Sequence, residues 1–462
     1  MLETFSRIVT VIYLALPPLT LWMAARRAKQ ARRAAPMLGF VMMAVAGIAV
    51  GSLVLILNAV ACAGRVTWTE FVQTVYLTVG ALCVLRWVDR GLLRLAFRLA
   101  RVRTDMVRFP LRGTPPRAVI ALFCQRLVLL ALAAPYALAL LCTYRPQLRT
   151  IEQGDPASRL GATFEAVQLA ASDGVRISAW WIDASEPPMS ADEAPQPHWG
   201  RDAVVLVPGW GGRKEHLVGT SAGPAGRGLA GVLIAGGWNV LAIDPRAHGG
   251  SSGRLCSFGD HERHDVLGAV RWLKANRPQA SHRVFVLGMN TGAAAALAAA
   301  TEGGDGQAID GVVLCEPFAD LDSLVQSNCD RVLPQPVSAL VANLSLPIAS
   351  LHSGADLTHF RPADYSARLW PRPLLVVYGR DESLVPLAQQ MGVYPAALGP
   401  KAQYWPTDNY TQRRSRDGNL SCELTKLLRQ ITGVEEGGMA NDPGAQQRTI
   451  RFLQQAQPIP AL

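Results

Sequence analysis

The chain changes its hydrophobic pattern near residue 150. Before that point apolar residues form long runs, and after it short apolar runs alternate with amphipathic stretches. The long runs cover roughly residues 7–25, 36–62, 70–87 and 126–143. The second run has 27 residues and no charged side chain, which is long enough for a helix to cross a bilayer. We therefore predict that residues 1–150 form a transmembrane region of about four helices.

The rest of the chain has the pattern of an α/β domain over residues 160–455. Short strand-like runs occupy residues 164–170, 175–182, 203–207, 238–243, 283–287, 311–314, 374–378 and 401–405. Helical patterns lie between them at 224–236, 261–276 and 291–302. This alternation predicts a mostly parallel central sheet flanked by helices. Residues 322–366 interrupt it, and we expect them to form a short lid.

The net charge of +10 is unevenly distributed. Residues 1–150 carry 19 Lys and Arg against 4 Asp and Glu, whereas the remainder is net negative. Because the basic third is also apolar, the charge indicates a membrane partner, with no nucleic acid. Cationic residues cluster between the first and second runs and between the third and fourth, and the positive-inside rule places both clusters in the cytoplasm.

This topology predicts a multi-pass protein of a plasma or inner membrane with its large domain outside the cytoplasm. If the fourth run does not cross the membrane, the large domain lies in the cytoplasm instead. Arg90, Arg94, Arg98 and Arg101 have helical spacing, which fits an amphipathic interfacial helix or a simple topology anchor. The eight cysteines form no CxxC pair, so we predict no zinc site and no cofactor.

The most informative motif is Gly288-Met289-Asn290-Thr291-Gly292. It follows a strand-like run and opens an alanine-rich helix, which is the context of the nucleophile elbow G-x-S-x-G. Asn290 stands where the serine belongs. Asparagine tolerates the positive φ that the central residue of this turn needs, but its amide is not a nucleophile. The residue therefore suits the backbone and not the reaction.

Six segments in sequence order resemble the α/β-hydrolase superfamily, within its serine-peptidase and lysophospholipase-like branch. They are Ser172-Asp173-Gly174, Val207 to Gly212, Asp244 to Gly253, Glu262 to Leu273, Gly288 to Gly292, and Gly379-Arg380-Asp381 with Val385-Pro386. The resemblance covers about residues 160–455. It implies an α/β-hydrolase fold with a short lid, attached to the transmembrane region.

The same resemblance assigns roles to individual positions. The backbone N–H groups of Trp210 and Thr291 would form the oxyanion hole, Gly288 and Gly292 would be the elbow glycines, and Asp381 would be the acid. A base histidine should follow the acid, yet none of the eight histidines follows Asp381. Nucleophile and base are both missing, and we expect the protein to be impaired as a serine hydrolase.

Three functions remain open. A membrane-anchored pseudohydrolase would bind a small acyl or ester ligand or a partner protein. An active hydrolase of esters, acyl lipids or peptides would need a displaced base, for which His216 and His359 are candidates. A sensor or transport accessory could use the spans themselves. His352, Asp356 and His359 have helical spacing for a metal, but the pattern is weak and we predict no metal.

Overall fold

The computed structural model describes residues 2–31, 34–61, 64–101, 115–145, 149–150, 154–184, 200–218, 228–379, 385–405 and 443–456. Contacts divide the chain into two compact units. The first comprises Met1–Leu57, Val66–Thr143 and Leu333–Gly354, and the second comprises Asn58–Arg65, Tyr144–Val332 and Ala355–Leu462. Each unit is described by itself.

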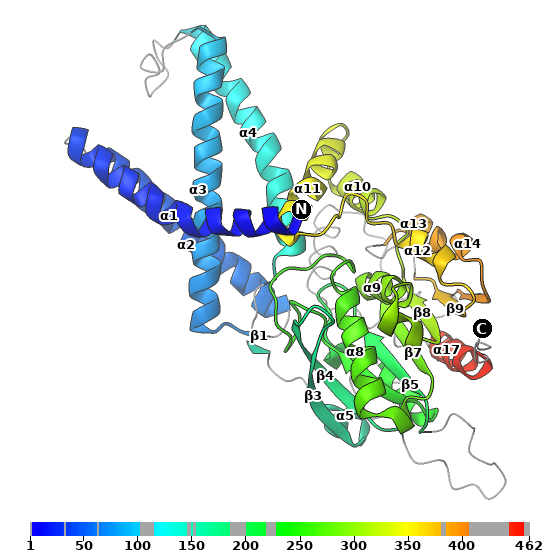
Figure 1. The fold of residues 1–462 in the computed structure, drawn as a ribbon. Helices are drawn as coiled ribbons and strands as arrows, with labels where there is room; N and C mark the ends of the chain where they lie inside the picture. The colour runs from blue at the N-terminus through cyan, green and yellow to red at the C-terminus, as the bar shows by residue number, and fades with distance from the viewer. Residues whose placement is uncertain are drawn as a thin grey trace, which may run out of the picture. The chain divides into compact units, whose positions relative to one another are not determined.

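The first unit is helical and contains four long helices (Figure 1): α1 (Leu2–Ala31), α2 (Ala35–Ala61), α3 (Trp68–Leu99) and α4 (Pro116–Thr143). All four are long and apolar enough to cross a membrane, as predicted. The third helix is longer than its apolar run. The arginine-bearing stretch continues the same helix to Leu99, because extending an existing helix needs no new nucleus.

A fifth helix, α11 (Val337–Ser353), belongs to this first unit although its sequence lies between two strands of the second. It packs on α4 and α1. Its buried face carries small residues at helical spacing, Ser338, Ala342, Ser345 and Ala349, which allow helix backbones to approach closely. At its end, His352 Nε2 lies 2.6 Å from the Tyr13 hydroxyl, which also bonds the hydroxyl of Tyr136. Part of the predicted lid is therefore built into the apolar helices.

The second unit is built on a sheet that has eight strands among the described residues (Figure 1), in the order β10-β9-β8-β7-β5-β6-β4-β3. The strands are β3 (Phe164–Ala170), β4 (Arg176–Ile182), β5 (Ala203–Val207), β6 (Asn239–Ile243), β7 (Val284–Met289), β8 (Gly311–Cys315), β9 (Leu374–Val377) and β10 (Lys401–Tyr404). β4 pairs antiparallel with β3 and β6, and all other pairs are parallel. The sheet confirms the predicted α/β-hydrolase fold class.

Helices cover both faces of this sheet. Along β5, Val205 and Val207 pack with α8 (Arg263–Asn276) and α9 (Thr291–Ala300), while Val204 and Leu206 pack with α7 (Gly228–Ala235) and α17 (Pro443–Gln455). Burial on both faces explains why β5 is apolar at every position. The remaining short elements are β1 (Gly64–Arg65), β2 (Arg149–Thr150), α5 (Pro156–Leu160), α6 (Lys214–Val218), α10 (Leu321–Val332), α12 (Pro362–Arg368), α13 (Leu387–Met391) and α14 (Val393–Ala396).

Candidate active site

The turn between β7 and α9 has strained elbow geometry. Asn290 adopts φ 51° and ψ −113°, and its N–H donates to Cys315 O at 2.8 Å. A Cβ on Gly288 would overlap the Gly292 carbonyl, and one on Gly292 would lie 2.5 Å from Val207 O. Backbone atoms cannot move aside as side chains can, so both positions need glycine. The turn is held in its strained form by close packing of β7 and α9 on β5.

The side chain of Asn290 forms no hydrogen bond with any described residue, and it is partly exposed. The next two N–H groups, of Thr291 and Gly292, also donate to no acceptor in the described part of the chain. They stand at the N-terminus of α9, where the helix dipole favours a negative or electron-rich group. This turn therefore offers one carboxamide and two backbone donors to a ligand oxygen.

The glycine-rich loop after β5 is held by a histidine from another segment. Gly211 N–H donates to His248 Nε2 at 3.0 Å, and His248 Nδ1 lies 2.8 Å from Arg246 O. Nε2 accepts, so Nδ1 carries the proton and the ring is neutral. Burial, with repulsion from Arg145, lowers the pKa of His248 to about 4. Because both ring nitrogens are occupied, His248 orders the loop and is not an available base.

Trp210 of the same loop is buried, and the Arg145 guanidinium stacks 3.7 Å from its ring centroid. The oxyanion role of its N–H stays a prediction.

Arg246 anchors the segment that carries His248. Its guanidinium makes two hydrogen bonds to Asp173, at 2.8 and 2.9 Å, and two to the buried Asp265, at 2.9 and 2.7 Å. Burial raises the pKa of Asp173, but the hydrogen bonds and charge of Arg246 outweigh it and hold that pKa below its usual value. The Asp244 to Gly253 segment thus has a positioning role, since Arg246 binds carboxylates of two other segments and Asp244 pairs with Lys214.

Sequence reasoning missed Glu316. Met289 and Cys315 are partners on the parallel strands β7 and β8, so Asn290 and Glu316 come next on adjacent strands at the same edge of the sheet. Glu316 also has a positive φ, 50°, which is unusual for a glutamate. Its Oε1 lies so close to Gly379, after β9, that a Cβ there would overlap it. The available signal was a carboxylate directly after a buried parallel strand.

Asp381, the predicted acid, lies outside the described residues. Gly379, two residues earlier, is described and follows β9, the neighbour of β8.

None of the described histidines forms a hydrogen bond with Asn290. His216 Nδ1 accepts from Arg213 N–H at 3.4 Å, His359 is 82% exposed and bonds Asp356, and His352 lies in the helical unit. Among the described residues, no group of three or more His, Cys, Asp or Glu side chains is placed to hold a metal ion.

Comparisons with known proteins extend these observations. Residues 216–363 match the family model described as serine aminopeptidase, S33. The chain is 28% identical over 174 residues to uncharacterized protein YqkD of Bacillus subtilis (strain 168), covering 36% of this chain and 54% of that protein. This chain therefore spans about half the length of the Bacillus relative.

It is also 25% identical over 239 residues to uncharacterized protein YfhR of Escherichia coli O157:H7, covering 51% of this chain and 69% of that protein. Among solved structures, the chain is similar to the Pyrococcus furiosus esterase Pf2001. The identity is 25%, the match covers 57% of this chain and 88% of that chain, and the TM-score is 0.43.

Proposed function

The second unit of this chain is a domain of the α/β-hydrolase superfamily, and from that premise we propose that it binds an acyl or ester ligand without cleaving it. The four apolar helices anchor this binding domain to a membrane. The ligand's carbonyl or carboxylate oxygen occupies the strained turn at Asn290, where an active relative would hold its reacting carbonyl.

The observation that carries the proposal is the chemistry of that turn. An amide side chain replaces the nucleophile, while the N–H groups of Thr291 and Gly292 remain available to donate to a ligand oxygen. Hydrogen-bond donors without a nucleophile stabilise a bound oxygen but open no covalent path. Both ring nitrogens of His248 are engaged in hydrogen bonds that order the glycine-rich loop, so this imidazole is not available as a base.

Three measurements on full-length protein in detergent test the proposal. A fluorophosphonate probe should leave residues 288–292 unlabelled, and p-nitrophenyl butyrate should be hydrolysed no faster than in buffer. Octanoate should raise the melting temperature of the wild type but not of Asn290→Asp, whose added charge repels the carboxylate. Asn276→Asp, at an exposed position on α8, is the matched control and should respond as the wild type does. Specific turnover, or an equal octanoate response in Asn290→Asp, would refute the proposal.

One observation favours a second candidate, an active hydrolase with displaced groups. Glu316 is a carboxylate in a strained conformation next to Asn290 along the sheet edge. It could take a proton from water as the water oxygen bonds the ester carbon, and return that proton to the leaving alkoxide. Turnover abolished by Glu316→Gln would support this route. Loss in His216→Ala or His359→Ala would instead support a histidine base.

A further inference from the structure

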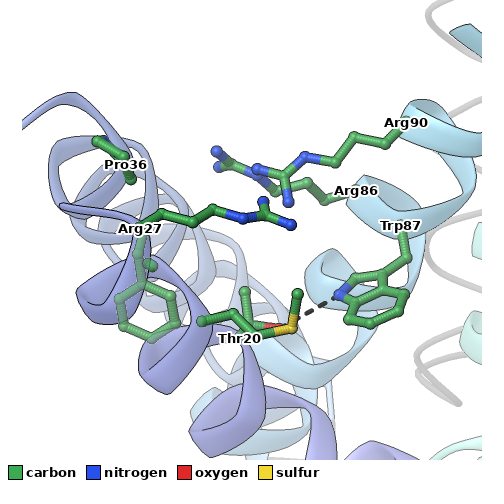
Figure 2. A pocket seen from close by; sticks show the side chains of 9 residues that line it. Thr20, Arg27, Pro36, Arg86, Trp87 and Arg90 are labelled. Atoms are coloured by element: carbon green, nitrogen blue, oxygen red, sulfur yellow. Dashed lines mark hydrogen bonds between the residues drawn. The ribbon is translucent and has the colours of Figure 1, made fainter. Parts of the chain in front are cut away.

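A second candidate site lies in the helical unit, where α1 ends and α2 begins. Three guanidinium groups, of Arg27, Arg86 and Arg90, point toward one another across a pocket (Figure 2). Arg27 comes from the last part of α1, and the other two come from the second half of α3. Arg27, 59 or more positions from the other two in the sequence, thus completes a group of three positive charges.

No ion pair balances these charges among the described residues. Arg86 donates from Nη1 to Gly39 O at 2.6 Å, while the side chains of Arg27 and Arg90 donate no hydrogen bond to a described residue. The carboxylate of Asp89 bonds Gln125 and Arg126 of α4 instead. Three converging cations repel one another, and a bound anion would remove that repulsion.

The rest of the pocket is apolar. Met23, Phe40 and Trp87 line it beside the arginines, and Trp87 Nε1 donates to Thr20 Oγ1 at 3.4 Å (Figure 2). A free inorganic anion would leave this apolar surface unused. A molecule with an anionic head and a hydrocarbon chain would occupy both parts.

The position along the helices supports a lipid. Arg27 lies three residues from the end of the apolar stretch Thr4–Gln30, and Pro36 begins the next such stretch. The ends of membrane-spanning helices lie at the level of lipid head groups, where arginine side chains meet phosphates.

We propose that Arg27, Arg86 and Arg90 form a binding site for the phosphate of an anionic phospholipid, with its acyl chain against Met23, Phe40 and Trp87. A guanidinium matches a phosphate with paired hydrogen bonds. A zwitterionic head group adds an ammonium that the arginines repel, so the site discriminates between the two classes of lipid.

The test uses full-length protein in detergent and three probes: dioctanoyl phosphatidylglycerol, dioctanoyl phosphatidylcholine and inorganic phosphate. Native mass spectrometry and quenching of tryptophan fluorescence report binding. We expect one phosphatidylglycerol to bind clearly more tightly than phosphatidylcholine. Arg86→Gln and Arg90→Gln should each weaken it about tenfold, which is the effect of losing one charge-assisted hydrogen-bonding group. Arg98→Gln removes the same charge from an exposed position on α3 and should change binding less than about twofold.

Each outcome bears on the site. Phosphate that competes only at far higher concentration than the lipid supports a lipid source, whereas phosphate that binds as tightly assigns the site to a free anion and refutes the lipid. Equal binding of both lipids, or an equal loss in Arg98→Gln, would refute the site and indicate diffuse attraction. Arg86→Lys is the control for misfolding, since it keeps the charge and should retain part of the affinity for phosphatidylglycerol.

Discussion

Acidification should destabilise the second unit through His248. This imidazole is 7% exposed, accepts from Gly211 N–H and is neutral. Its pKa falls from an ordinary 6.5 to about 4, chiefly because burial disfavours the charged ring. Between these values the unfolded chain binds a proton that the folded chain does not. Stability from this group is therefore complete above pH 6.5 and is lost as the pH falls toward 4.

The size of the effect follows from the two pKa values. One pKa unit corresponds to 1.36 kcal/mol, so the full loss below pH 4 is about 3 kcal/mol. Linkage gives a loss of about 2 kcal/mol between pH 7 and pH 5. That interval is informative because most carboxylates have not yet become protonated in it. Once protonated, His248 can no longer accept from Gly211, so the glycine-rich loop should loosen first.

The assay compares wild type with His248→Gln, which keeps an acceptor and removes the titration. Free energies of unfolding come from urea titrations of the full-length protein in detergent, followed by fluorescence of the buried Trp181 and Trp238. Between pH 7 and pH 5 the wild type should lose about 2 kcal/mol more than His248→Gln. His359→Gln, which removes an 82% exposed ring, should lose as much as the wild type. Parallel pH profiles for wild type and His248→Gln would refute the reasoning.

Three further predictions concern the turn and the groups behind it. Asn290→Ser alone should leave hydrolysis of p-nitrophenyl butyrate at the rate in buffer, because no base is in place to take the serine proton; efficient turnover would show that the base is not missing. Gly292→Ala should cost about 3 kcal/mol in urea unfolding, since its Cβ meets backbone at 2.5 Å, whereas Gly303→Ala, with open space around it, should be nearly neutral. Arg246→Lys should cost about 2 kcal/mol by losing its paired bonds to two carboxylates, and Arg271→Lys at an exposed ion pair should change little; equal effects would show that the buried network adds no stability.

The strands of the second unit could be located from the sequence because their signal is local. Short, mainly apolar runs bounded by glycine, proline and charged residues coincide with β5 and β6 to within a residue. The turn at Asn290 was also predictable, since a strand, two glycines and a helix in this order specify a positive φ at the residue between the glycines. The four apolar helices were predictable because length and composition alone decide them.

The candidate site was less predictable from the sequence, because it depends on which strands are neighbours in the sheet. Glu316 lies beside Asn290 only because β8 pairs with β7, and the sequence separates the two residues by 26 positions. The hydrogen bond that Gly211 donates to His248, from a different loop, became visible only in the folded chain. Long-range hydrogen bonds carry no local pattern, so no period or spacing could have revealed them.

By itself, the sequence determined the type of each element, since hydrophobic period and turn chemistry act within a few residues. The tertiary structure determined which elements pack against one another. Helix α11 has an apolar pattern that would suit a lid over the sheet, yet its small residues let it pack closely with α4 and α1. The sequence did not indicate that Arg27 lies near Arg86 and Arg90, because this proximity depends on the packing of α1 on α3. The packing partner of an element depends on how well whole surfaces fit together. The most complementary faces bury the most apolar surface, wherever they lie in the chain.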